Sequence, residues 1–399
     1  MLKNLWTQAV LEKRLGPGWT GLRIIFSWLS LPYYLAIAGR LWLYRLKLIK
    51  PVKLPVPVIS VGNITAGGTG KTPMVISLAE KLAGQGKKVG ILSRGYGRIK
   101  TNQQKNINRP AACLPIRQGR QDDDEDFITS EPASGSNQPN PAKVFRLTGV
   151  NRLKSGYTLI HNYGVDTIII DDGFQHLKLH RDINLLMIDC LNPFGHRRLL
   201  PAGLLREPLS GLQRADIFIL TRTDLVNDEA LKDIESYLKK FNKPVIKSIH
   251  RPVNLTPLNG TSNVTPAPLG ILEVVGGGGR LLTLDKLAGK KYFGFCGIGN
   301  PVGFQKTLER LSGQLTGLAV FPDHHLYQTD NLKQINLAAD EKQAELLITT
   351  EKDTKRLKCL LVPPPAGKET GLSLPVYALK IELVITEGEP VLDEMLDHI

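Results

Sequence analysis

The sequence has 399 residues, more than one ordinary domain needs, and its 42% hydrophobic residues are enough to form two separate cores. Its four cysteines have no paired spacing, which excludes a disulfide framework or a zinc site and favours a reducing, cytosolic compartment. A net charge of +14 suits nucleic acid, anionic lipid or a phosphorylated substrate, so the distribution of the charge has to separate these partners.

Residues 1–53 form a basic first segment. They contain nine Lys or Arg against one acid, Glu12, and all four tryptophans of the chain. Because indole rings prefer the boundary between water and hydrocarbon, this composition indicates a membrane surface and no nucleic-acid partner. The apolar run 24–39 contains Pro32 and falls short of the ~20 residues that span a bilayer, so we expect it to lie on or dip into the membrane. Packing on the protein's own core is the alternative.

From residue 54 to residue 250, short apolar runs alternate with helix-length stretches. This pattern predicts an α/β domain with a largely parallel sheet and helices on both faces. Strands are expected at 56–61, 88–92, 143–147, 167–170, 184–188 and 217–220. A polar, acidic stretch at about 99–142 is interpreted as a loop insert in this domain.

The remainder predicts a second unit. Residues 251–280 are rich in Pro and Gly and are expected to form a linker or hairpin. Residues 281–399 are expected to form a smaller α/β domain with strands at 291–296, 318–321, 346–349 and 376–383.

A phosphate-binding loop follows the first predicted strand of the core domain. The strand leads into a glycine-rich loop and a Gly-Lys-Thr sequence at a helix start, which is the context of a P-loop. Glycines let backbone N–H groups face phosphate oxygens, Lys71 reaches the β- and γ-phosphates, and Thr72 holds Mg²⁺. Thr65 departs from the pattern, which has Gly there. The predicted nucleotide-binding residues are Gly67, Gly68, Thr69, Gly70, Lys71, Thr72 and Pro73.

Two adjacent acids end a later apolar strand. A P-loop needs a second anchor for its metal, usually an Asp at a strand end, and Asp171 and Asp172 supply it. The sequence leaves open which of the two binds Mg²⁺. Arg94 and Tyr96 follow the strand 88–92 at the carboxyl edge, where open α/β sheets bind ligands, so both are candidates for the acceptor site.

A third polar group, Asp323-His324-His325, follows a predicted strand of the second unit. A metal pair, a His that is polarised by a carboxylate to assist deprotonation of a hydroxyl, and a buried structural His are all open. The second fits a kinase best.

Together these motifs resemble the tetraacyldisaccharide 4′-kinase family of lipid A (lipopolysaccharide) biosynthesis. The resemblance extends over nearly the whole chain, and its blocks are 62–73, 93–97, 171–176, 201–207, 295–301, 323–325 and 350–353. It implies a membrane-associated P-loop kinase with two α/β/α domains, a hairpin linker and an N-terminal helix in the inner leaflet. It also implies that the protein uses ATP, with Mg²⁺, to phosphorylate the 4′-hydroxyl of a tetraacyldisaccharide 1-phosphate at the cytoplasmic face of the inner membrane.

The resemblance also implies roles for single residues. Lys71 and Thr72 would serve the nucleotide and Mg²⁺, and Asp172 and Glu207 would be acids on the metal side. His324 would pair with an acidic general base. The residues implied to meet the acceptor or phosphates are Arg94, Tyr96, Arg152, His176 and Arg206.

The general base is the point at which the chain departs from the family pattern. The family's Gly-Asp-Glu-Pro-type string is replaced here by the long insert. Asp124, in an acidic run, and the Ser130-Glu131 segment are the two candidates, and Asp124 is favoured because proton abstraction needs a carboxylate.

Two other function classes compete with the kinase. Residues 220–224 resemble the guanine-reading Asn-Lys-x-Asp string but lack the Asn, which leaves a P-loop GTPase or regulatory switch at the membrane as the alternative. A nonenzymatic membrane scaffold would leave Asp171, Asp172 and the Asp-His-His segment without a role.

Overall fold

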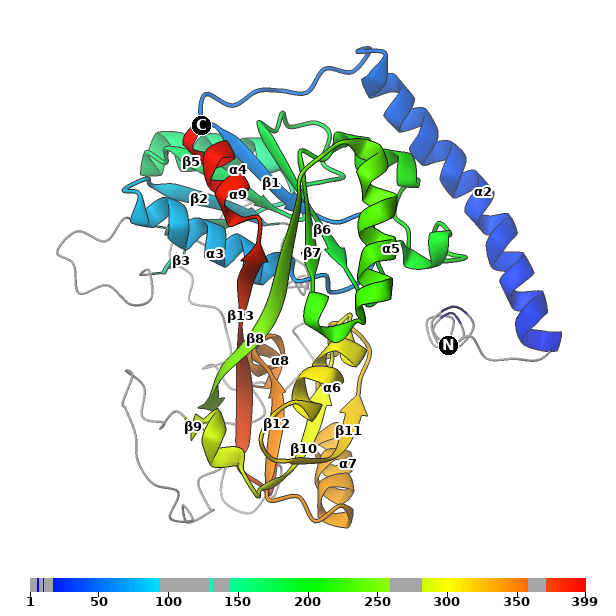
Figure 1. Cartoon of the computed structure of the whole chain (residues 1–399), viewed down its shortest axis with the longest axis vertical. Coiled ribbons are helices and arrows are strands. Elements are labelled where there is room, and N and C mark those ends of the chain that lie inside the picture. Colours follow the sequence, from blue (N-terminus) through cyan, green and yellow to red (C-terminus); the bar gives the residue numbers. More distant parts are fainter. Residues whose placement is uncertain are drawn as a thin grey trace, which may run out of the picture. The chain divides into compact units, whose positions relative to one another are not determined.

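The computed structural model describes residues 6, 10, 17–93, 129–131, 144–258, 282–357 and 371–399 (Figure 1). The described residues form two compact units. The first contains residues up to 93, 129–131, 144–249 and 383–399, and the second contains 250–258, 282–357 and 371–382.

The first unit is built on a mostly parallel sheet with strand order β7-β6-β1-β5-β2-β4-β3, in which β3 alone is antiparallel to its neighbour. The beginning of β8 pairs with β7 in parallel. The strands are β1 (Val58–Gly62), β2 (Val89–Ser93), β3 (Thr129–Glu131), β4 (Val144–Thr148), β5 (Thr167–Asp171), β6 (Ile183–Asp189), β7 (Ile217–Thr221) and β8 (Val245–Pro257).

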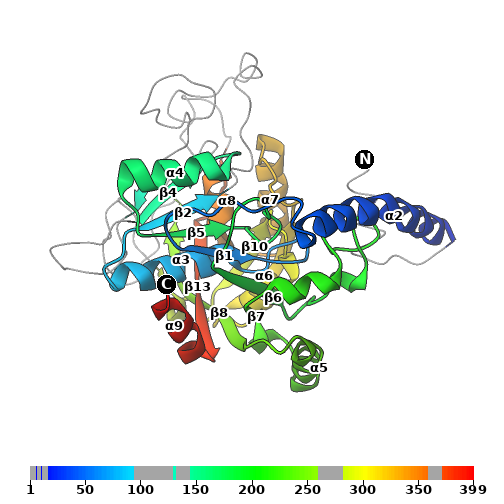
Figure 2. The same ribbon diagram turned by 90° about the horizontal axis from the view of Figure 1, so that it is seen from above.

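Helices cover both faces of this sheet. Alternate side chains of β1 point to opposite faces, so that Ile59 and Val61 join the core under α3 (Lys71–Gly84) and α9 (Glu389–Asp397), whereas Val58 packs in the core under α4 (Arg152–Tyr163). Figure 2 shows α4 on the opposite side of the strands from α3 and α9. A further core on the α4 face joins β6 and β7 to α5 (Asp228–Leu238). The predicted α/β class with helices on both faces is confirmed.

The second unit has a parallel sheet with strand order β11-β10-β12-β13, and β9 (Leu282–Thr283) is antiparallel to the end of β8. One face packs on α7 and α8 and the other on α6. These elements are β10 (Lys291–Cys296), α6 (Pro301–Glu309), β11 (Gln314–Val320), α7 (Thr329–Glu341), β12 (Leu346–Thr350), α8 (Glu351–Leu357) and β13 (Val376–Glu387). Short 3₁₀ helices in the two units are 195–197, 209–214, 223–225, 239–241 and 284–287.

The end of the chain belongs to the first unit, whereas the sequence analysis assigned residues 281–399 to the smaller domain. β13 contains the boundary between Glu382 and Leu383. Helix α9 then buries Leu392 and Leu396 in the core of α3, and Lys81 of α3 forms ion pairs with two of its acids.

Helix α2 (Pro17–Arg45) is longer than the apolar run in the sequence suggested. It is long and apolar enough, by length and composition, to cross a membrane. Pro32 lies inside the helix, although proline has no backbone N–H and so removes one hydrogen bond of the helix. Large apolar side chains are exposed along it: Ile24, Ile25, Trp28, Leu29, Leu31, Leu35 and Trp42.

Candidate active site

The P-loop connects β1 to α3 and contains two glycines with positive φ. Gly67 has φ 125°, and Gly70, the residue before α3, has φ 85°. Residues that carry a side chain rarely adopt these φ values, so the loop needs glycine at both positions. Thr65, where the usual pattern has Gly, forms an antiparallel bridge with Leu205, an extended conformation that needs no glycine. The local geometry therefore accommodates the departure in the motif.

Two side chains at the end of β7, Thr221 and the following Arg222, bind carbonyl groups of the P-loop. Thr221 Oγ1 donates to the carbonyl of Thr69 at 3.2 Å, and Arg222 Nη2 donates to that of Gly68 at 3.1 Å. Arg222 is itself paired with the buried Asp189 at 2.7 Å. Loop carbonyls that are bonded to these groups leave the loop N–H groups to a phosphate. The segment that resembled a guanine-reading string therefore supports the phosphate loop.

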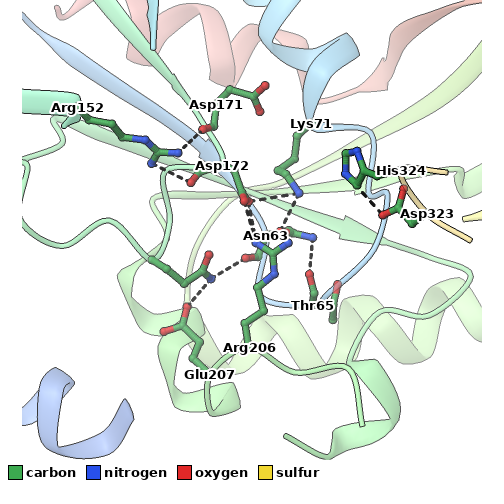
Figure 3. Close-up of polar contacts among 11 residues, drawn as sticks. Asn63, Thr65, Lys71, Arg152, Asp171, Asp172, Arg206, Glu207, Asp323 and His324 are labelled. Atoms are coloured by element: carbon green, nitrogen blue, oxygen red, sulfur yellow. Dashed lines mark hydrogen bonds and ion pairs between the residues drawn. The ribbon is translucent and has the colours of Figure 1, made fainter. Parts of the chain in front are cut away.

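Lys71 begins α3 and lies among polar groups of the first unit (Figure 3). Its Nζ donates to Asn63 Oδ1 at 3.0 Å and pairs with Asp172 Oδ1 at 3.3 Å. Burial lowers the pKa of Lys71, and the neighbouring Asp172 opposes this shift. The ammonium group is thus held where a P-loop lysine meets phosphate.

Asp172 follows β5 with φ 57°, a strained value for a residue other than glycine. Its carboxylate accepts two hydrogen bonds of 2.9 Å from Arg206 Nη1. Burial alone would raise the pKa of Asp172, but the charges and hydrogen bonds of Lys71 and Arg206 hold it below its usual value. The structure therefore brings three predicted site residues into one ionic cluster.

Arg152 and Arg206 have different partners. The buried Arg152 donates to the carbonyls of Asp172 and Asp171, each at 3.0 Å, so it fixes the strand end that carries both acids. Arg206 is positioned by its backbone, since its N–H donates to Ile64 in the P-loop and its carbonyl accepts from Tyr33 of α2. Arg206 thereby connects the P-loop, the acids and helix α2.

Glu207 has partners other than the predicted metal. It is 1% exposed, pairs with Arg214 at 2.6 Å and accepts a hydrogen bond from Gln175 at 2.9 Å. Within the described ranges, no group of three or more His, Cys, Asp or Glu side chains could hold a metal ion. Thr72, Asp171 and Asp172 nevertheless offer the hydroxyl and carboxylate oxygens that Mg²⁺ prefers when phosphates supply its other ligands.

His176 lies in a strongly positive environment. Burial, together with Arg152, Arg181, Arg40 and Lys178, lowers its pKa from 6.5 to about 4. These cations make the region attractive to an anion. A pocket beside it combines apolar side chains of α2 with guanidinium groups and is lined by Ile37, Arg40, Leu41, Gln175, Leu177, Arg206, Glu207 and Arg214.

The two histidines of the second unit differ. His325 hydrogen-bonds Asn331 Oδ1 at 3.0 Å and stacks on Phe321, so it has a structural role. His324 has φ 61° and a side chain that is 60% exposed, with Nε2 3.9 Å from Asp323 Oδ2 (Figure 3). His324 is the one that solvent or a ligand can reach.

Several predicted residues lie outside the described part of the chain. These are Arg94, Tyr96 and Asp124, and of Ser130 and Glu131 only the backbone is described, in β3. Sequence reasoning missed Asn63, Arg214 and Arg222. Asn63 lies inside the P-loop block 62–73, and Arg222 lies in the segment 220–224 that resembles a guanine-reading string. The sequence around Arg214 gives no sign of its contact with Glu207.

Comparisons with known proteins identify relatives over most of the chain. The family model of tetraacyldisaccharide-1-P 4′-kinase matches residues 22–399. A protein of Halothermothrix orenii named tetraacyldisaccharide 4′-kinase is 38% identical over 331 residues, which cover 82% of this chain and 81% of that protein. One of the same name from Syntrophus aciditrophicus is 36% identical over 394 residues, 96% of this chain and 93% of that protein.

A solved structure agrees with these relatives. The crystal structure of LpxK from Aquifex aeolicus in complex with ATP is 28% identical and has a TM-score of 0.59, and the match covers 94% of this chain and 99% of that one. Family model, relatives and solved structure thus all indicate the same family. The chain belongs to the tetraacyldisaccharide-1-phosphate 4′-kinase family.

Proposed function

We propose that this protein transfers the γ-phosphoryl group of ATP to the 4′-hydroxyl of tetraacyldisaccharide 1-phosphate in lipid A biosynthesis, at the cytoplasmic face of the inner membrane. The observation that carries the proposal is the cluster of Lys71, Asp172 and Arg206 at the P-loop. The backbone carbonyl of Arg206 accepts a hydrogen bond from Tyr33 of the apolar helix α2, which links this cluster directly to the helix. This arrangement suits a phosphoryl donor in water and an acceptor that lies in a lipid surface.

The P-loop residues bind and orient the donor. Backbone N–H groups at the start of α3 and the ammonium of Lys71 meet the β- and γ-phosphates. Arg206 Nη1 lies 2.9 Å from Asp172 Oδ1. Its guanidinium would supply a second cation for the negative charge that develops on the transferring γ-phosphoryl group. In phosphoryl transfer such positioning and charge stabilisation account for most of the catalysis.

Mg²⁺ fits the oxygen donors of this site. Thr72 and one or both of Asp171 and Asp172 would hold it together with the nucleotide, whereas Glu207 is only 1% exposed. Bound by these residues, Mg²⁺ would supply positive charge against the negative charge that develops on the phosphates. Arg152 fixes the backbone of both acids and so sets where their carboxylates lie.

The acceptor side is proposed at α2. Ile37 and Leu41 of this helix lie beside Arg40, Arg206 and Arg214, so apolar side chains for acyl chains would adjoin cations for a phosphate or sugar. A carboxylate, Asp124 by preference over the Ser130-Glu131 segment, would accept the proton of the 4′-hydroxyl with the help of His324. Arg94 and Tyr96 would complete the acceptor site.

The test is transfer of labelled γ-phosphate from ATP, with Mg²⁺ and detergent, to tetraacyldisaccharide 1-phosphate. We expect transfer by the wild type and none to an acceptor that lacks the 4′-hydroxyl. Loss of transfer in Asp124→Ala with retention in Ser130→Ala would support Asp124 as the base. A folded, ATP-binding protein that transfers nothing to this acceptor, or one that prefers GTP, would overturn the proposal.

A further inference from the structure

In the second unit, several segments meet at the backbone of Gly297, the residue after β10. Its N–H donates to Asp353 Oδ2 at 3.2 Å. Its carbonyl accepts from the N–H of His324 at 3.1 Å and from Arg356 Nη1 at 2.8 Å. A Cβ at this position would lie 3.1 Å from His325 Cβ and 3.2 Å from Asp353 Oδ1, so the close approach favours glycine. One peptide group thereby links the histidine loop to α8.

Asp353 fixes the orientation of Arg356. It has no exposed surface, accepts a hydrogen bond from Thr350 Oγ1 at 2.6 Å and pairs with Arg356 Nη1 at 3.1 Å. A buried carboxylate has to be paired with charges or hydrogen-bond donors, because an unpaired charge inside a protein is strongly destabilising. The guanidinium is therefore held on two sides, by Asp353 and by the carbonyl of Gly297.

The other terminal nitrogen of Arg356 contacts the imidazole. Arg356 Nη2 lies 3.1 Å from His324 Nδ1. A guanidinium has only donors, so Nδ1 has to be the acceptor in this hydrogen bond. The proton of the imidazole then resides on Nε2, the nitrogen that lies 3.9 Å from the Asp323 carboxylate.

We propose that Arg356 is a positioning residue which, held by Asp353 and Gly297, fixes His324 in the tautomer with its proton on Nε2. The proposal rests on the proposed function, in which His324 assists an acidic general base. In this tautomer Nε2–H donates to the carboxylate of the acidic general base and orients it. That carboxylate then accepts the proton of the attacking hydroxyl. Gly297 and Asp353 belong to the blocks 295–301 and 350–353, which thereby acquire a role in positioning His324.

The test combines a direct reading of the tautomer with kinetics. In full-length protein labelled with ¹⁵N-histidine, two-bond ¹H–¹⁵N correlations report which ring nitrogen carries the proton, and His324→Gln assigns the signal among the 8 histidines. We expect the Nε2–H form in the wild type and a mixture of tautomers in Arg356→Ala. We also expect kcat to fall about 10- to 100-fold in Arg356→Ala, as for other residues that orient a functional histidine, with nucleotide affinity unchanged.

Two further variants make the outcome decisive. Lys333→Ala removes an exposed positive charge from the same unit and should change neither tautomer nor kcat. Arg356→Lys keeps a charge beside Asp353, but one ammonium cannot serve Asp353, Gly297 and His324 together. This variant should therefore fold, yet show the mixed tautomers and the reduced kcat of Arg356→Ala. An unchanged tautomer in both Arg356 variants would overturn the proposal. A tautomer change in a protein without 4′-kinase activity would instead remove the proposed function and leave the positioning intact.

Discussion

Asp171 and Asp172 are neighbours in the sequence, yet their surroundings differ. Asp172 turns into the left-handed region of φ and places its carboxylate between Lys71 and Arg206. The sequence could predict that these two acids anchor the site, because acids at the end of a buried strand after a P-loop have few other uses. It could not predict the ionic cluster, because Arg206 reaches Asp172 only through backbone pairing with the P-loop.

Arg152 illustrates the same limit. The resemblance implied that it meets the acceptor or a phosphate, but its guanidinium donates to two backbone carbonyls. Such a contact depends on how α4 packs beside β5, which no local spacing encodes. Lys71, in contrast, was found from spacing alone, since the glycines around it are required by backbone geometry.

Lys71→Ala should abolish most turnover, by on the order of 10²-fold or more, because it removes the cation that meets the transferring phosphate. The measurement is kcat and nucleotide affinity in the transfer assay. Lys81→Ala is the matched control, since Lys81 lies on the same helix and pairs with Glu389 of α9. Equal activity in the two variants would contradict the role of the P-loop.

His176 should make stability depend on pH. Its pKa is about 4 in the folded protein against 6.5 in the unfolded chain, so between these values the unfolded state binds more protons. Its contribution to stability is therefore complete above pH 6.5 and is lost as the pH falls towards 4. We expect the thermal midpoint of His176→Gln to depend less on pH between 6.5 and 4.5 than that of the wild type. His161→Gln, at an exposed position, should show the pH dependence of the wild type. Parallel curves for all three proteins would rule out this contribution.

At the scale of elements, buried parallel strands were the easiest to predict. Strands β1, β5, β6 and β7 lie within two residues of their predicted ends, because strands covered on both faces read as continuous apolar runs. All of β8 was missed, because no strand was expected at 245–250 and Pro252 and Pro257 suggested a linker or hairpin from residue 251. Its burial alternates from Ile246 to His250, as expected for a strand with partly exposed sides.

Helix α2 has two different sides. Ser30, Tyr33 and Arg40 bond to backbone groups of residues 175 and 199–206. Trp28 and Leu35 are 72% and 60% exposed. One side of the helix is therefore held by the first unit, and the other side is free to enter a lipid surface. The sequence composition indicated the lipid contact, and the hydrogen bonds show which side of the helix faces the protein.

Trp28→Ser with Leu35→Ser should weaken binding to phospholipid vesicles about 100-fold or more, because each side chain loses ~1.5–3 kcal/mol of burial in the bilayer boundary. Co-sedimentation with vesicles measures the effect. Leu337→Ser is the control, as Leu337 is 71% exposed on α7, far along the chain from α2. Unchanged vesicle binding in the double variant would show that α2 is not the membrane contact.

For the molecule as a whole, the division into two units follows from where apolar side chains gather. The first unit has cores around α3, α4 and α5, and the second has cores on both faces of β10 and β12. Length and composition predicted two cores. They could not predict that the chain returns to the first unit after Glu382, because that return depends on α9 packing against α3.

Separate cores predict separate unfolding. We expect calorimetry of the full-length protein in detergent to resolve two transitions, since each unit buries its own apolar side chains. ATP with Mg²⁺ at about 100 times its Kd should stabilise the P-loop unit by roughly 2.7 kcal/mol and shift only the transition of that unit. Lys71→Ala should abolish the shift and Lys81→Ala should retain it. If ATP moved both transitions equally, or if one transition contained all the heat, the units would not be independent, and nucleotide binding at the P-loop would have to be read as stabilising the whole chain.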